Sequence, residues 1–228
     1  MENNRELYNH LAEKYDLRQQ NPATQLLRLK ENGLIKKYSK GLVFDLGCGT
    51  GYHLGLSNQI IGLDISEKML KKAKNKKRPL IQADIEWLPI KTRSLESVFC
   101  FYSALNMVDY QKAAKEMSRI VKSGGNIILS VASIKDADKS RSSQQTKIKK
   151  FRLEGKPVNI RLLEKNEVIQ AFENSSFKLK SFGSIFRMQK PRWGNFQKFS
   201  PLEKIKLKIE KLFPKEWGKI YLFVFEKV

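Results

Sequence analysis

A short apolar strand that runs into a glycine-rich turn constrains this chain most. Residues 42–46 are apolar except for Asp45, and Gly47-Cys48-Gly49-Thr50-Gly51 follows at once. Glycines let a backbone turn sharply after a strand and approach a ligand closely. Dinucleotide sites use Gly-x-Gly-x-x-Gly, whose amides hold a pyrophosphate. Here the third glycine comes one residue earlier, and Asp45 would repel a phosphate but would suit an ammonium group.

Apolar strands and helices alternate after this turn. Strands are predicted at residues 42–46, 59–63, 80–83, 97–102, 126–131, 177–182 and 220–226. Helices are predicted at residues 3–17, 22–38, 109–121, 164–174 and 200–213, and one more begins after Ser66. The pair Gly124-Gly125 is expected to stop the helix before the fifth strand. Continuous apolar strands between helices indicate an α/β fold with a parallel sheet covered on both faces.

The helix predicted at residues 200–213 has the clearest boundaries. Ser200 is expected to be its N-cap, Pro201 takes the first helical position and Glu203 completes a capping box. Four aliphatic residues make one stripe along it, and lysines lie on or beside its polar face. The stripe consists of Leu202, Ile205, Ile209 and Leu212.

The charge is strongly positive and uneven. The formal net charge is +21, and residues 135–228 contain 23 basic and 10 acidic residues, a net of +13. Such a field attracts polyanions or anionic surfaces, although solvated lysines could also account for it. We expect one domain over residues 1–228, with a helical cap at 1–40, an irregular, mobile basic insertion at 135–156 and a helical insertion at 184–217.

Nothing in the sequence suggests secretion or a structural metal. No apolar run reaches the roughly 18 residues that span a bilayer, and the polar N-terminus does not look like a signal peptide. The two cysteines form no disulfide or zinc pattern. A cytoplasmic protein without a metal site is expected.

The ordered motifs resemble those of the class I S-adenosylmethionine (SAM) methyltransferases. The resemblance implies SAM as cofactor, S-adenosylhomocysteine as product, and a Rossmann-like, mostly parallel seven-stranded sheet whose last strand is antiparallel. It assigns methionine contacts to the turn at 45–51, ribose contacts to Asp64 and adenine contacts to Ala83-Asp84-Ile85. Lys122-Ser123-Gly124-Gly125 resembles the family's turn before the fifth strand. The implied cofactor residues are Asp45, Gly47, Cys48, Gly49, Gly51, Asp64, Ile65, Met69, Ala83, Asp84, Ile85 and Tyr102.

A narrower resemblance is to the tRNA wobble-uridine methyltransferases, which esterify a carboxymethyl group. The segment Tyr15-Asp16-Leu17-Arg18 and the short link Gly51-Tyr52-His53-Leu54 are similar to that family's. The chain departs from it at Leu105-Asn106, where the family often has His-His. The resemblance implies a tRNA substrate and a small activator protein as partner, so the chain would be a monomer or a heterodimer.

Methyl transfer needs mainly positioning, and a carboxylate acceptor is already ionised at neutral pH. No convincing general base is present, and Tyr15, Arg18, Tyr102 and Asn106 are the candidates for the acceptor side. RNA contacts are expected from Lys147, Lys149, Lys150, Arg187, Arg192 and Trp193. Two alternatives remain open. One is a small-molecule or lipid methyltransferase, since a basic amphipathic helix can lie on an anionic membrane. The other is a non-catalytic SAM-binding partner.

Overall fold

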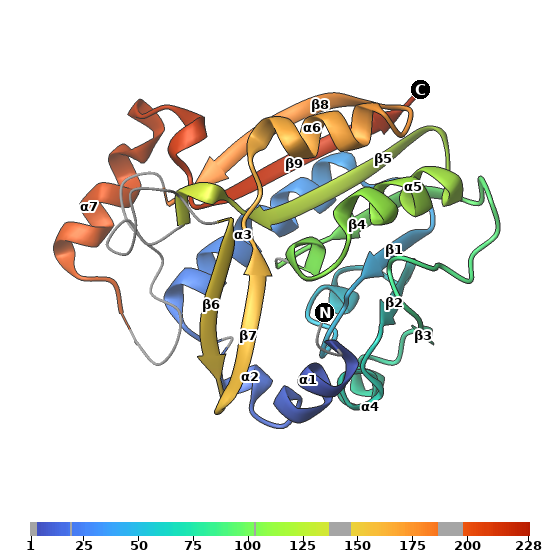
Figure 1. Cartoon of the computed structure of the whole chain (residues 1–228), viewed down its shortest axis with the longest axis horizontal. Coiled ribbons are helices and arrows are strands. Elements are labelled where there is room, and N and C mark those ends of the chain that lie inside the picture. Colours follow the sequence, from blue (N-terminus) through green and yellow to red (C-terminus); the bar gives the residue numbers. More distant parts are fainter. Residues whose placement is uncertain (1–3, 19, 103, 137–146, 187–197) are drawn as a thin grey trace.

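The computed structural model describes residues 4–18, 20–102, 104–136, 147–186 and 198–228, with only the backbone of Arg18 and Asp136. Seven strands form one sheet in the order β3-β2-β1-β4-β5-β9-β8 (Figure 1). β1 to β5 are parallel, and β9 pairs antiparallel with both β5 and β8. The strands are β1 Val43–Leu46, β2 Ile60–Asp64, β3 Leu80–Gln82, β4 Leu95–Cys100, β5 Val121–Ala132, β8 Phe177–Ile185 and β9 Ile220–Lys227. The predicted seven-stranded, mostly parallel sheet with an antiparallel last strand is confirmed.

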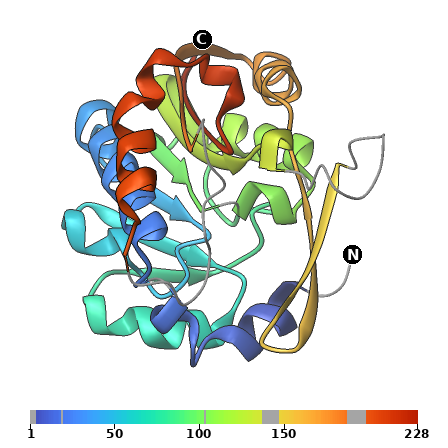
Figure 2. The ribbon, with the colours of Figure 1, turned by 90° about the vertical axis from the view of Figure 1, so that its left-hand side faces the viewer.

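Helices cover both faces of this sheet, as predicted (Figure 2). On one face α5 (Tyr110–Ile120) and α6 (Lys165–Glu173) pack against the side chains of one strand alternation, such as Val98 and Cys100. On the other face α3 (Pro22–Tyr38) and α4 (Glu67–Ala73) pack against the opposite alternation, such as Phe99. Short 3₁₀ turns complete the core: η1 His53–Leu56, η2 Lys74–Lys76, η3 Ala104–Met107 and η4 Ile134–Asp136.

The predicted helix starts are confirmed by their capping bonds. The Ser66 hydroxyl accepts a hydrogen bond from the Met69 N–H at 3.1 Å, and Asp109 accepts from two N–H groups of α5. α7 (Pro201–Ile209) begins with the predicted capping box, in which Ser200 Oγ accepts from the Glu203 N–H at 3.2 Å. Two 3₁₀ turns follow it, η5 Glu210–Leu212 and η6 Lys215–Trp217. The aliphatic stripe of α7 faces away from the sheet.

The N-terminal helix is not continuous, so that prediction was wrong. It divides into α1 (Asn4–Leu11) and α2 (Tyr15–Arg18). Leu11 and Ala12 are each 1% exposed, because they pack against Met69 of α4 where α1 ends. The Lys14 N–H donates to the Leu11 carbonyl and closes the turn between the two helices. Tertiary burial of this corner therefore overrides the helical pattern.

The second half of the basic segment 135–156 contains regular structure that was not predicted, while the expected mobility of this insertion stays a prediction. β6 (Ile148–Leu153) and β7 (Lys156–Arg161) form an antiparallel hairpin. Glu154 and Gly155 make its turn with positive φ angles of 47° and 78°, a turn that matches the strand twist. Leu153 packs against the cluster at α1, and His10 Nε2 lies 3.3 Å from the Glu154 carbonyl. The hairpin thus reaches from the end of β5 to α1 (Figure 1).

Gly124-Gly125 does not stop a helix, which corrects another prediction. α5 ends at Ile120, and the glycine pair lies inside β5, where the register between β4 and β5 shifts. A Cβ atom on Gly125 would lie 2.9 Å from the Glu96 carbonyl oxygen. Gly125 therefore permits close approach of β4 and β5.

Asn106 should be a major contributor to stability, because its amide ties η3 to two strands. It is 2% exposed; Oδ1 accepts from the Ala132 N–H at 2.8 Å, and Nδ2 donates to the Ala132 and Arg161 carbonyls at 2.9 and 2.5 Å. Asn106→Ala removes these three hydrogen bonds to the backbone and should lower the free energy of unfolding by about 2–4 kcal/mol in urea titrations. The exposed control Asn75→Ala should change it by less than about 0.5 kcal/mol. A loss in Asn106→Ala as small as the control's would contradict this assignment.

Candidate active site

A pocket opens at the carboxyl ends of β1, β2 and β4, under α1 and α2. In open parallel sheets this edge is where ligands bind. The space between its walls is about 710 Å³, including its mouth. We call it the main pocket. Its lining residues are Asn4, Tyr8, Tyr15, Gly47, Gly49, Asp64, Ile65, Met69, Ala83, Asp84, Ile85, Glu86, Phe101, Tyr102, Ala104, Met107 and Val108. Nine of the twelve predicted cofactor residues are among them, so the structure brings these distant segments together.

The glycine-rich turn forms one wall of the main pocket. Gly47, Gly49 and Gly51 have φ angles of 77°, 55° and 83°, in the left-handed region that favours glycine. The N–H groups of Gly47 and Cys48 donate to the Leu63 carbonyl at 2.7 and 2.9 Å, which ties the turn to β2. A Cβ atom on Gly47 would lie 2.9 Å from that of Ala104. Gly51 does not line the main pocket, and a Cβ atom on it would lie 3.0 Å from Leu54 and 3.2 Å from Ala73, so it keeps the turn tight.

Asp64 is the last residue of β2, and backbone N–H groups donate hydrogen bonds to both of its carboxylate oxygens. Its Oδ1 accepts from the Ser66 N–H and its Oδ2 from the Gly49 N–H, each at 2.8 Å. Burial raises the pKa of the Asp64 carboxyl, and these backbone N–H groups oppose the rise. Each carboxylate oxygen has a second lone pair, so Asp64 can still accept hydrogen bonds from a ligand in the main pocket.

Asp84 occupies the opposite part of the wall, between the apolar neighbours Ala83 and Ile85. Its Oδ1 accepts from the Glu86 N–H at 2.9 Å, which fixes the turn after β3. Glu86 in turn accepts from the Asp109 N–H at 2.8 Å. The result is a fixed acceptor flanked by two aliphatic faces, an arrangement suited to the edge and faces of a planar heterocycle.

Beneath the glycine-rich turn lies a buried polar cluster formed by Glu31, Asp45 and His53. They are 0%, 2% and 8% exposed. Glu31 Oε1 accepts from the Ser130 hydroxyl at 2.5 Å, and Glu31 Oε2 lies 3.4 Å from His53 Nε2. Glu31 Oε2, Asp45 Oδ2 and His53 Nε2 make no hydrogen bond within the described part of the chain. Buried polar atoms without hydrogen-bond partners favour a place where a ligand or a water supplies them.

Sequence reasoning missed Glu31, because it stands among polar residues in α3. A signal was present: Leu27, Glu31 and Ile35 recur every four residues, and this spacing puts Glu31 on the buried face of the helix.

Burial raises the pKa of Asp45 to about 7; His53 opposes this rise, while Asp64 and Glu31 add to it. A carboxyl with such a pKa is only partly ionised at neutral pH. A cation placed beside Asp45 would stabilise its charged form, so binding of a cation and ionisation of Asp45 should favour each other.

A second, smaller pocket adjoins this cluster, and we call it the polar pocket. It shares Tyr15, Gly47, Gly49, Phe101 and Tyr102 with the main pocket. Its remaining lining residues are Arg28, Glu31, Asp45, Cys48, Thr50, Tyr52 and His53. The Arg28 guanidinium lies 3.8 Å above the Tyr52 ring. The polar pocket is therefore lined by one cation, Arg28, and two buried carboxylates, Glu31 and Asp45. This combination suits a zwitterion, such as the amino-acid part of a ligand.

The structure does not bring the candidates for the acceptor side together at one place. Tyr15 lines both pockets, and burial raises the pKa of its phenol well above the ordinary value, so it stays protonated at neutral pH. The Tyr102 hydroxyl lies 3.0 Å from Thr24 Oγ1. The Arg18 side chain lies outside the described residues. Asn106 does not line the main pocket, and its amide is committed to the backbone bonds described above.

Asn106 lies on a neighbouring groove, which we call the outer groove. This groove shares Asn4, Met107 and Val108 with the main pocket. Its other lining residues are Leu7, Asn106, Asp109, Tyr110, Gln111, Ile148, Pro157, Val158, Asn159 and Arg161. The groove therefore joins the main pocket to the β6–β7 hairpin.

The residues predicted to bind RNA are only partly described. Lys147 pairs with Glu164 and Glu167 at 3.2 and 2.7 Å, so it already has local anionic partners. Lys149 and Lys150 lie on β6 of the hairpin. Arg187, Arg192 and Trp193 lie outside the described residues.

Comparison with known proteins extends these observations. A family model described as "Methyltransferase domain" matches residues 44–129. An uncharacterized protein of Methanocaldococcus jannaschii is 39% identical over 135 residues, 58% of this chain and 53% of that protein. A second uncharacterized protein of that organism is 32% identical over 176 residues, 75% of this chain and 74% of that protein. Demethylmenaquinone methyltransferase of Staphylococcus carnosus is 36% identical over 110 residues, 43% of this chain and 45% of that protein. The chain thus spans about half the length of the first relative and under half of the third.

Solved structures share the fold at low identity. A SAM-dependent methyltransferase from Thermotoga maritima aligns with a TM-score of 0.69 and 18% identity, over 98% of this chain and 99% of that one. A Haloferax volcanii methyltransferase, solved in complex with the Trm112 methyltransferase activator, aligns with a TM-score of 0.67 and 18% identity. That alignment covers 98% of this chain and 96% of the other.

The raised pKa of Asp45 gives a prediction for the ligand-free protein. A carboxyl has a pKa of about 3.9 in the unfolded chain, and burial raises that of Asp45 to about 7. Between these values the folded state binds the extra proton, so its stability falls as the pH rises. Asp45→Asn removes this cost. In urea titrations wild type should lose about 1.4 kcal/mol per pH unit relative to the variant across that window. Stability curves that stay parallel from about pH 4 to pH 7 would show that Asp45 ionises freely.

Proposed function

The chain belongs to the class I SAM-dependent methyltransferases, and we propose that it transfers the SAM methyl group to a small, largely apolar acceptor. The observation that carries this proposal is the pair of connected pockets. The main pocket offers acceptors and aliphatic faces for a nucleoside, and the polar pocket offers opposite charges for an amino acid. SAM consists of these two parts, joined by a sulfonium.

We infer that the following residues would hold the cofactor. Asp64 would accept hydrogen bonds from the ribose, and Asp84 would accept from the adenine amino group beside Ile65 and Ile85. In the polar pocket, Glu31 and Asp45 would face the ammonium group. Arg28 would face the carboxylate. Glu31, Asp45 and His53 each have one buried atom without a hydrogen-bond partner, and an ammonium group could donate hydrogen bonds to such atoms.

Bound SAM would supply a methyl group on a positively charged sulfur. A lone pair of the acceptor would attack the methyl carbon in line, and the bond between carbon and sulfur would break to release S-adenosylhomocysteine. The protein's own part is positioning and exclusion of water. Tyr8 and Tyr15 meet edge to face, with ring centroids 6.5 Å apart, and form the cover over the glycine-rich turn. Their phenols stay protonated, so they can donate hydrogen bonds but do not serve as bases at neutral pH.

The acceptor class follows from the residues available. The described lining of the main pocket contains no histidine or lysine. Its carboxylates are otherwise engaged: Asp64 and Asp84 would hold the cofactor, and Glu86 accepts from the Asp109 N–H. We therefore expect a nucleophile that is already ionised at neutral pH, such as a carboxylate. The acceptor would enter beside Met107 and Val108, and Arg161 in the outer groove offers a cation for an anionic end. One relative is named demethylmenaquinone methyltransferase, which supports an acceptor other than RNA.

An RNA substrate is the second candidate, and the β6–β7 hairpin favours it. Beside the outer groove the hairpin presents Lys149, Lys150 and Arg152, with Phe151 36% exposed. Cations with an exposed aromatic ring suit a phosphate backbone and a stacked base. A tRNA carrying a carboxymethyl group would fit an enzyme without a base, and one structural neighbour was solved with an activator protein. The cytoplasm remains the predicted compartment for either substrate.

A methyl-transfer assay separates these candidates. Purified chain is incubated with radiolabelled SAM and extract, and the product is divided into RNA, protein, lipid and small-molecule fractions. The proposal predicts label in the lipid or small-molecule fraction, with none in the Gly47→Val control, whose side chain would collide with Ala104. Label confined to RNA would replace it with the tRNA candidate. Labelling of no fraction would favour a non-catalytic SAM-binding partner.

The placement of the two cofactor parts can be tested with a truncated ligand. Methylthioadenosine has the adenosyl part of SAM but lacks the amino-acid part. Glu31→Gln should weaken binding of S-adenosylhomocysteine by about tenfold or more in calorimetry, because a charge-assisted hydrogen bond is lost. It should leave methylthioadenosine binding unchanged. Asp64→Ala should weaken both ligands by a similar factor. If Glu31→Gln weakened both ligands equally, Glu31 would act through the fold and not on the ammonium group.

A further inference from the structure

α7 lies on the protein with its polar side inward. Glu203, Lys206, Leu207 and Glu210 are buried or half-buried, and their spacing follows one face of the helix. Leu207 packs against the core cluster that contains Leu27 and Phe186. The opposite face carries the aliphatic stripe: Leu202 is 60% exposed, Ile205 54%, Ile209 39% and Leu212 of the following turn 83%. A surface helix normally buries such a stripe.

The charged residues of α7 are also divided between its two faces. Lys204, Lys208 and Lys211 are exposed and recur along one side of the aliphatic stripe. Both acidic residues of residues 198–212, Glu203 and Glu210, lie on the inward side. The outward face therefore combines aliphatic side chains with cations, and it presents no carboxylate.

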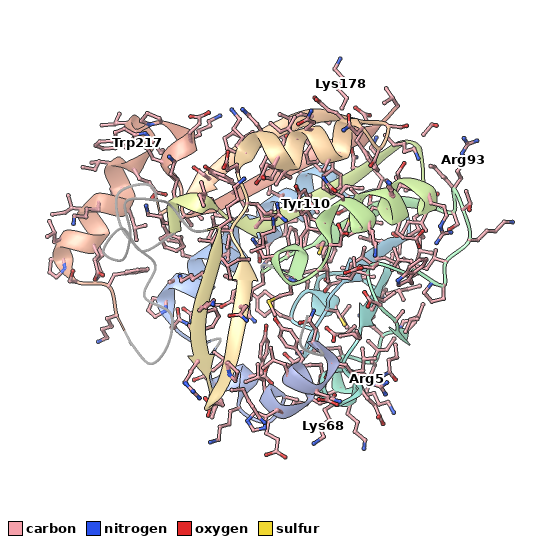
Figure 3. The ribbon with its side chains drawn as sticks, viewed as in Figure 1. Arg5, Lys68, Arg93, Tyr110, Lys178 and Trp217 are labelled. Carbon is pink, nitrogen blue, oxygen red and sulfur yellow. The ribbon has the colours of Figure 1, made fainter. Side chains whose placement is uncertain are left out.

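The position of α7 relates this face to the active site. β8 runs parallel to β5, so its last residue, Ile185, lies at the same edge of the sheet as the glycine-rich turn. β9 begins at this edge with Ile220 and runs in the opposite direction. α7 lies between these two points in the chain and stands outside the sheet in both ribbon views (Figures 1 and 2). Trp217, which is 49% exposed, lies at the same end of the molecule as α7 (Figure 3).

The chemistry of this face selects one occupant. Leucine and isoleucine have no aromatic face or hydrogen-bonding group with which to recognise bases, so RNA would leave the stripe unused. A second copy would bring two rows of lysines together, each on a chain of net charge +21. An anionic lipid surface meets both needs, because acyl chains take aliphatic residues and phosphates take lysines.

We propose that α7 docks the protein on the surface of an anionic lipid bilayer. Leu202, Ile205, Ile209 and Leu212 enter the boundary of the acyl chains, and the lysine row contacts lipid phosphates. Trp217 lies at headgroup level, where tryptophan is enriched. Among the described helices none is long and apolar enough to cross a membrane, so α7 lies along the surface. This docking does not depend on which molecule accepts the methyl group.

Flotation of the full chain with lipid vesicles tests the proposal. Wild type should float with phosphatidylglycerol vesicles and remain unbound with phosphatidylcholine vesicles. The triple variant Lys204→Gln, Lys208→Gln, Lys211→Gln should lower the partition coefficient by about a hundredfold, or about fivefold per lysine. The double variant Ile205→Gln, Ile209→Gln should lower it by about tenfold or more. All these side chains point outward, so melting temperatures should stay near that of wild type.

Matched controls make the same chemical changes elsewhere. Lys68→Gln, Lys71→Gln, Lys74→Gln removes three exposed charges at α4 and η2, and Figure 3 shows Lys68 at the opposite end of the molecule from Trp217. Leu29→Gln changes an aliphatic residue of α3 that is 67% exposed. Neither control should reduce flotation beyond about twofold. Failure of wild type to bind phosphatidylglycerol vesicles would overturn the proposal. So would equal losses in the α4 and α7 variants, or loss of tRNA binding with unchanged flotation in the α7 variants.

Discussion

Two carboxylates lie buried beneath the glycine-rich turn, and the cost of burying their charge explains much of the arrangement around them. Asp45 on β1 and Glu31 on α3 are almost fully inaccessible, and each has an oxygen without a hydrogen-bond donor among the described residues. Burial raises the pKa of Asp45 to about 7. Groups of this kind persist when function compensates their cost. A ligand cation would supply both the donors and the opposite charge.

Glu31 also links the N-terminal cap to the sheet. Its other oxygen accepts from the Ser130 hydroxyl of β5, and Ser130 in turn accepts from the Tyr102 N–H at 2.8 Å. One side chain of α3 thus contacts the polar pocket and, through Ser130, the loop after β4. A ligand that neutralises Glu31 should therefore stabilise α3 on the sheet as well as itself in the pocket.

Local patterns predicted the sheet, the turn and the helix caps, because each depends on neighbouring residues. Asp45, Asp64 and Asp84 could be placed at strand ends for the same reason. The periodicity of α3 could have placed Glu31 on the buried face of the helix, but it could not predict the role of Glu31, since that role depends on α3 crossing behind β1 and β5. The hairpin of β6 and β7 was missed because its strands are mostly exposed and basic, although Glu154-Gly155 was a turn signal. The outward orientation of α7 could not follow from its periodicity, because an amphipathic pattern gives two faces and does not say which one meets the protein.

The most direct test of this account is a crystal structure of the chain with S-adenosylhomocysteine. The account predicts the ribose hydroxyls on Asp64, the adenine between Ile65 and Ile85, and the amino group within hydrogen-bonding distance of Glu31 or Asp45. The carboxylate of the ligand should lie toward Arg28. A ligand whose amino-acid part points away from the polar pocket, with Glu31 and Asp45 still lacking donors, would contradict the central claim that the buried carboxylates hold the cofactor.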